Sequence, residues 1–363
     1  MSDFRFRRLE RHKVGGTTQD MQLSIPIPKS PSGKIYRFCP LPDCEPNLFQ
    51  IGDSPINQSI ELERSKLIRR KPSTTGITCP YCGHDAPDEE YNYPDDVNAV
   101  KDYVIWAAEQ DVGDAVEQWA RDLNRQLQRS GGGLFSMKMD VKRNRKSAPF
   151  VWREDLLRDL TCDTCGRRYG VYAIALFCPD CGARNLHVHY AREKELVKEQ
   201  VKLAEQVERD GNGELAYRLL GNAHEDVLTV FETYLKTIYR FLLKRRFPED
   251  APKLGKKSAI GNKFQNIERG RSLFSNIGID PYSHLTQEDL EFLQLNIEKR
   301  HVVGHNLSMA DEAYSQAASS EQPGQTVKLL ADEIIRFAEV CGTVVTRLEE
   351  ESPEFFPPVK EQQ

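Results

Sequence analysis

Four pairs of cysteines constrain the fold of this chain more than any other feature of its sequence. Eight of its nine cysteines fall into closely spaced pairs, and only Cys341 stands apart. The N-terminal stretch MSDFRFRRLERHK lacks the apolar core of a secretory signal, so we expect a cytoplasmic protein. Disulfides are rare in that reducing compartment, and cysteine pairs at this spacing therefore indicate bound metal.

The two C-terminal pairs have the clearer pattern. They occur in the strings CDTCG and CPDCG, and twelve residues separate them. Gly166 and Gly182 follow the pairs and supply backbone conformations that other residues adopt reluctantly. Four thiolates close a tetrahedron around Zn(II) and leave no open position for water or substrate. The pattern resembles a structural zinc ribbon, and its predicted ligands are Cys162, Cys165, Cys178 and Cys181.

The two N-terminal pairs are more loosely spaced. Cys39 and Cys44 form a C-x4-C pair, Cys79 and Cys82 form a C-x2-C pair, and 34 residues lie between them. We predict a second four-cysteine site with a long insertion, although His84 is an alternative ligand to one of the cysteines. An iron–sulfur cluster is the competing occupant of either site, and the ribbon pattern favours zinc. The predicted cofactors are therefore two structural Zn(II) ions.

Hydrophobic periodicity predicts an α+β multidomain chain, in which two small β-rich zinc ribbons with a helical insertion precede an all-α four-helix bundle. Residues 191–212 are charged and carry only a narrow apolar stripe, which predicts a connector helix that pairs with a second copy of itself. The predicted parts are a β-rich ribbon module (1–87), a helical insertion with a basic loop (88–150), a second ribbon (151–190), the connector (191–212) and the bundle (213–352).

Four amphipathic segments predict the bundle. The first has one apolar face, made by Val227, Leu228, Phe231, Leu235, Ile238 and Leu242. The second covers roughly residues 260–274, and the third begins at Thr286, a suitable N-cap with acidic residues in the following turn. The last, around residues 326–350, is strongly amphipathic and includes Cys341 as an ordinary buried thiol. Four helices within this length favour a bundle.

The string RHVVGHN places Arg300 and His305 at the end of the third of these helices. About two arginine–histidine pairs at such spacing are expected by chance in a chain of this composition, and the chain contains five, so spacing alone decides nothing. What distinguishes this pair is its place in a helical bundle and the polar His301 beside the arginine. The other pairs are Arg5 and Arg7 with His12, Arg184 with His189, and Arg218 with His224.

In this setting EKRHVVGHN resembles the motif of the HEPN superfamily, an arginine, a polar residue, three further residues and a histidine. The resemblance covers roughly residues 214–350 and implies metal-independent cleavage of RNA. It implies that Arg300 grips the phosphate, that His305 acts as acid or base, and that His301 positions the substrate or moves a second proton. The segment HEDVLTVFETYLK resembles the early helix that contributes an acidic residue, with Glu225 and Glu232 as candidates.

The resemblance also implies that two chains meet to complete one site, so we expect a homodimer. A non-catalytic alternative stands beside it: Arg300 favours the C-terminal end of a helix dipole, and the two histidines are polar residues at that end. Many members of the superfamily are inactive or act as interaction modules. In that case the ribbons and the bundle bind nucleic acid or protein without cutting it.

Charge adds little to the choice of partner. The net charge of −5 does not favour nucleic acid, although VKRNRKS (141–147) is a compact basic run. No apolar stretch approaches the roughly 20 residues that cross a bilayer, so we expect no membrane partner. The sequence therefore predicts an endoribonuclease of defence or stress whose ribbons recognise RNA, another nucleic acid or a partner protein.

Overall fold

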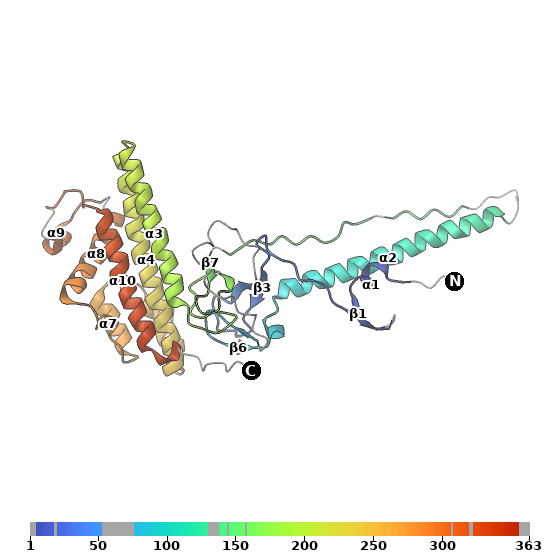
Figure 1. Cartoon of the computed structure of the whole chain (residues 1–363), viewed down its shortest axis with the longest axis horizontal. Helices are drawn as coiled ribbons and strands as arrows, with labels where there is room; N and C mark the ends of the chain where they lie inside the picture. Colours follow the sequence, from blue (N-terminus) through green and yellow to red (C-terminus); the bar gives the residue numbers. More distant parts are fainter. Residues whose placement is uncertain are drawn as a thin grey trace.

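The computed structural model of the chain describes residues 5–17, 20–52, 76–129, 138–143, 145–156, 158–305, 308–318 and 322–355, without the side chains of residues 304, 305 and 313. The chain combines helices with small sheets, as the α+β prediction has it. Figure 1 shows a helical bundle at one end, a small β-rich part in the middle and one long helix that projects away from both.

The β-rich part is held together by one antiparallel sheet with the strand order β3 (Ile35–Phe38), β4 (Leu48–Ile51), β8 (Arg168–Val171) and β7 (Arg158–Thr161). Phe49 on β4 lies opposite Val171 on β8, so the sheet joins the two predicted ribbons. We call this unit the metal module (residues 30–52, 76–91 and 158–185). It also contains the hairpin of β5 (Ile77–Thr78) and β6 (Asp85–Ala86) and the short helix η1 (Asp88–Tyr91).

The insertion between the two halves of the module is an arm. Its helix α2 (Pro94–Arg129) has 36 residues, about 54 Å at 1.5 Å per residue, and forms the helical part predicted for this insertion. Residues 138–143 and 145–156 run back along it without regular structure. The run SGGG (130–133), which the sequence predicts as the end of this helical insertion, lies outside the described residues. The short helix α1 (Arg7–Glu10) packs on α2, and β1 (Lys13–Gly16) pairs with β2 (Met21–Leu23) beside it.

Four long helices form the bundle: α3 (Leu186–Arg209), α4 (Gly213–Arg246), α8 (Gln287–His305) and α10 (Ala331–Glu351). All six residues of the predicted apolar face of α4 are buried, and Cys341 is fully buried in α10. Thr286 caps α8 as predicted, since its Oγ1 accepts a 3.1 Å hydrogen bond from the amide of Asp289.

The predicted helix over residues 260–274 is not continuous. Gly261, at φ +51°, ends α6 (Lys257–Ile260), and the Asn266 side chain accepts the Arg269 amide to begin α7 (Ile267–Ser275). A left-handed residue and an extended cap interrupt the helical hydrogen bonds, so the segment divides. The remaining short elements are α5 (Ala251–Leu254), η2 (Lys263–Gln265), α9 (Glu312–Ala318) and η3 (Pro353–Phe355).

The segment expected to be a connector lies inside the bundle. Of its predicted apolar stripe (Leu196, Val197, Val201, Leu203 and Val207), Val197 and Val201 are buried together with Ala204, and α3 packs against both α4 and α10 (Figure 1). The buried part of the stripe therefore makes contacts within the chain, whereas Leu196 and Leu203 are 38% and 49% exposed.

The metal module has its own core, and its residues Ile174, Leu176 and Phe177 extend into the core of the bundle. Phe177, from the second ribbon, packs on Phe241 of α4 at a ring-centroid distance of 5.5 Å, and Phe241 stacks on Phe355 at 4.7 Å. Burial of these aromatic rings fixes the module to one end of the bundle. Among the described helices, none has the length and apolar character needed to cross a membrane.

Candidate functional site

Each group of four cysteines has the geometry of a metal site. The four sulfur atoms of each group lie within 4.8 Å of one another. At the first site Cys39 Sγ lies 3.8 Å from Cys82 Sγ, and Cys44 Sγ lies 3.6 Å from Cys79 Sγ. At the second site the Cys162–Cys181 and Cys165–Cys178 separations are 3.8 and 3.7 Å. A tetrahedron with Zn–S bonds of about 2.3 Å has edges of about 3.8 Å, so both groups fit one ion.

The loops that carry the cysteines repeat one backbone pattern. In each C-x2-C-G turn the glycine amide donates to the carbonyl oxygen of the first cysteine, at 3.0 Å for Gly83 and 2.9 Å for Gly166 and Gly182. All three glycines have φ near +70°. Because side chains disfavour this conformation, glycine is required there, as predicted for Gly166 and Gly182. The turns place both thiolates of a pair on one side.

The geometry also decides between His84 and the cysteines as ligands, and between zinc and an iron–sulfur cluster as the bound metal. His84 stands outside the first ligand group, and its ring lies beside that of Tyr91 at 6.2 Å. An iron–sulfur cluster attaches its thiolates to different iron atoms and so holds the sulfurs farther apart than one ion does. Two buried, closed four-thiolate groups therefore suit two structural zinc ions, and the ligands are the eight predicted cysteines.

A second candidate site lies at the end of α8. Arg300 and His301 line a cavity of about 250 Å³ between α8, the turn before α7 and α9. The Arg300 guanidinium donates through Nη2 to Glu225 Oε1 of α4 at 2.8 Å. The helix continues through Gly304 and ends at His305, and the side chain of His305 lies outside the described part. The structure thus brings together Arg300, His301 and Glu225 of the residues implied by the resemblance.

Glu232, the other acidic candidate, is separated from Arg300. Its carboxylate accepts a hydrogen bond from Gln265 Nε2 at 3.0 Å and pairs with Lys236 at 2.6 Å. Gln265 itself lines the cavity. Glu232 therefore orients an amide of the cavity wall rather than the guanidinium.

His224, which belongs to another of the five arginine–histidine pairs in the sequence, is buried in the core next to this region. Its ring is 1% exposed, stacks on Phe337 at 5.1 Å and lies 3.1 Å from Asn296 Oδ1. Burial, helped by the positive charges of Lys299 and Arg300, lowers the pKa of His224 to about 4. The sequence did carry a signal for the burial of His224: it lies three and four residues before Val227 and Leu228, and so extends the apolar face of α4.

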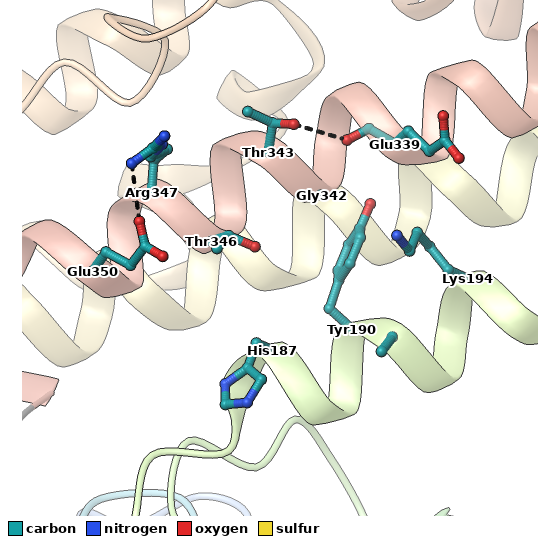
Figure 2. A pocket seen from close by; sticks show the side chains of 10 residues that line it. His187, Tyr190, Lys194, Glu339, Gly342, Thr343, Thr346, Arg347 and Glu350 are labelled. Carbon is teal, nitrogen blue, oxygen red and sulfur yellow. Dashed lines mark hydrogen bonds and ion pairs between the residues drawn. The ribbon is translucent and has the colours of Figure 1, made fainter. Parts of the chain in front are cut away.

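A groove of about 530 Å³ runs between α3 and α10 (Figure 2). At one end His187 lies 2.7 Å from Asp163 of the second metal loop and 3.4 Å from Glu349 of α10. Hydrogen bonds to Glu349 and then Asp163 raise the pKa of His187 to about 9. In the middle of the groove the Tyr190 ring approaches Gly342, and its hydroxyl donates to the Ala338 carbonyl at 2.9 Å. The contact of His187 with Asp163 joins the bundle to the metal module, and the Tyr190 contacts hold α3 against α10.

The basic run is largely neutralised by α2. Arg143 pairs with Asp114 at 2.5 Å, Arg145 pairs with Glu117 at 3.2 Å, and the Lys146 ammonium lies 3.5 Å from Glu109. These pairs attach the returning segment to the helix. They reduce the positive charge that the run offers to a nucleic acid.

No family model, curated protein or solved structure matches this chain.

Proposed function

We propose that the chain is a metal-independent endoribonuclease of the HEPN type, acting in defence or stress, with Arg300, His301 and His305 at its site. The observation that carries the proposal is the placement of Arg300 and His301 on the wall of a cavity at the end of α8, with the guanidinium held by Glu225. The resemblance of the sequence motif supports the same residues.

The proposed chemistry needs these residue types. The ribose 2′-hydroxyl attacks the adjacent phosphorus, so a proton must leave that hydroxyl and another must reach the departing 5′-oxygen. Imidazole titrates near neutral pH and suits both transfers, which the proposal gives to His305 and His301. Negative charge grows on the phosphoryl oxygens, and a permanently charged guanidinium stabilises it. Glu225 uses only one Nη of Arg300, so the fork keeps further donors for phosphate.

The proposal gives the zinc ions no part in the chemistry, since four thiolates leave no open coordination position. The metal module instead recognises RNA or a protein partner and presents it to the bundle. Its rigid attachment supports this role: Lys244 Nζ donates to the Asp43 carbonyl at 2.8 Å, beside the first metal site. Two chains complete one active site in the proposed homodimer.

RNA cleavage in EDTA tests the proposal. We expect the full-length protein to cut mixed RNA, and the double variant Arg300→Ala/His305→Ala to be inactive. Arg336→Ala is the control, because this arginine lies on the same bundle and pairs with Glu288 at 2.7 Å, away from the cavity. Zinc content is measured after the assay to show that EDTA has left the structural sites loaded. No cleavage by the wild type, or equal cleavage by the double variant, favours the non-catalytic binding module.

A further inference from the structure

The cavity beside Arg300 has walls that go beyond what phosphate binding requires. Three of its apolar residues, Leu228, Ile297 and Val302, are at most 4% exposed. Its volume of about 250 Å³ lies just below the roughly 300–1,000 Å³ of sites for drug-sized ligands. A single ring system with polar edges suits such a space.

The polar groups of the wall are held in fixed orientations. Gln265 Nε2 donates to the Glu232 carboxylate at 3.0 Å, and Gln294 Nε2 donates to Glu298 Oε1 at 2.6 Å. An ionised carboxylate only accepts hydrogen bonds. Each glutamine therefore turns its amide nitrogen toward its own carboxylate partner and keeps its amide oxygen for another partner. Asn266 is held the opposite way, since its Oδ1 accepts the Arg269 amide at 2.9 Å and its Nδ2 remains a donor.

The wall therefore offers both acceptors and donors. The Gln265 and Gln294 oxygens and the Glu298 carboxylate accept hydrogen bonds, whereas the Asn266 amide, the second N–H of each glutamine and the Arg300 guanidinium donate. Glu298 is the carboxylate among these acceptors, and a carboxylate can accept from two adjacent donors on one base edge. Among the nucleobases, guanine alone presents two adjacent donors, N1–H and N2–H2, next to an acceptor, O6, on its Watson–Crick edge. Adenine and cytosine present an amino donor beside ring acceptors, and uracil presents one donor between two acceptors.

We infer that the cavity beside Arg300 is a guanine-binding site in which Glu298 accepts from the donor edge of the base. The inference rests on the proposed function for the position of the phosphate, which Arg300 holds at the cavity wall. The base of the nucleotide that carries this phosphate then enters the cavity. Cleavage is directed to guanosine positions in unpaired RNA, where a base can leave the stack.

Glu291 provides a matched control for Glu298. It lies on the same helix and receives the same kind of hydrogen bond, from Gln287 Nε2 at 2.8 Å, but it is exposed and lies away from the cavity. Glu298→Gln exchanges an acceptor for an amide of equal size. Glu291→Gln makes the same change of charge on the same helix.

Calorimetric titration of the full-length protein with the four nucleoside 3′-monophosphates tests the inference. We expect guanosine 3′-monophosphate to bind roughly tenfold more tightly than the other three, as a good paired contact to a base permits. Glu298→Gln removes that preference and Glu291→Gln keeps it. Arg300→Ala weakens all four nucleotides alike, because it removes a phosphate contact. Circular dichroism melts check that each variant is folded.

The outcomes separate this inference from the proposed function. Equal binding of the four nucleotides, tightest binding of another base, or a preference that survives Glu298→Gln overturns the guanine site, even if RNA is cleaved. Selective guanosine binding that depends on Glu298 supports the site, even if no RNA is cleaved, and in that case only the nuclease proposal fails.

Discussion

Arg300 of α8 and Glu225 of α4 form an ion pair with a 2.8 Å separation between Nη2 and Oε1. The side chains are 21% and 44% exposed, and a pair at such exposure contributes only about 0–1 kcal/mol to stability. The value of the pair therefore lies in orientation: it fixes Nη2 of a guanidinium that lies on the wall of the cavity.

Arg300→Lys should abolish most RNA cleavage although the charge is kept. A lysine ammonium has three donors but no planar fork, so it does not offer phosphate a paired set of donors while one edge is held by Glu225. We expect a rate loss of roughly 100-fold or more in single-turnover assays, as for removal of one transition-state donor. Glu225→Gln keeps a hydrogen-bond acceptor and should lose less, about tenfold. Cleavage by Arg300→Lys at the wild-type rate would show that orientation is unimportant.

Loss of one zinc site should have different effects on the two halves of the molecule. Elemental analysis should find two zinc ions per chain in the wild type and one in Cys44→Ser or Cys165→Ser. Cys165→Ser should lower the melting temperature of the bundle more, because Phe177 joins the second ribbon to Phe241 of α4. In zinc-finger peptides such sites contribute about 10–16 kcal/mol of binding free energy, so the loss should be large.

Cys341→Ala is the control for the zinc count. This thiol is fully buried in α10 and stands outside both metal groups, so two zinc ions should remain. Iron in the wild-type protein, or a single metal ion per chain, would contradict the assignment of two zinc sites.

The local features of this fold could be predicted from sequence, and the long-range ones could not. Cysteine spacing identified eight ligands because each pair lies within one turn. The pairing of Phe49 with Val171 has no local signal, and so the two ribbons were expected as separate modules. The few apolar residues of α3 explain why it resembled a connector: Leu196 and Leu203 belong to its narrow stripe but are 38% and 49% exposed, and no local signal reports the contacts of α3 with α4 and α10.

The candidate site, too, has residues that a local motif indicates and residues that only tertiary contacts bring together. The motif identified Arg300 and His301 from a string of seven residues. The cavity beside them also needs Gln265 and Asn266 from the break before α7, where a continuous helix had been expected. Tertiary contacts decide which amide faces which carboxylate, and no pattern along the chain reports them.

Acid should destabilise the protein through His224. Its pKa in the folded chain is about 4, below the value of about 6.5 for an unperturbed histidine, so the unfolded chain binds this proton first. Stability from this group is complete above pH 6.5 and is lost as the pH falls toward 4. The free energy of unfolding should decrease by about 1.4 kcal/mol per pH unit in that window, roughly 2 kcal/mol by pH 5.

Urea unfolding at pH 7 and pH 5 measures this effect. His224→Gln removes the titrating ring, and the difference between the two pH values should shrink by about the same roughly 2 kcal/mol. An unchanged difference in the variant would assign the acid sensitivity to other groups.

Gly342 should resist any side chain, because the ring of Tyr190 from α3 fills the space beside it. A Cβ at this position would lie 2.8 Å from Cε1 of Tyr190, whose ring is also held by the hydrogen bond to Ala338. The ring is 5% exposed and has little room to move, so Gly342→Ala should cost about 1–3 kcal/mol of unfolding free energy despite the better helix propensity of alanine. Gly213→Ala is the matched control, since a Cβ there meets nothing within 4 Å at the start of α4. It should be neutral or stabilise by up to about 1 kcal/mol. If both variants unfold at the same urea concentration, the contact between Tyr190 and Gly342 does not set the spacing of the two helices.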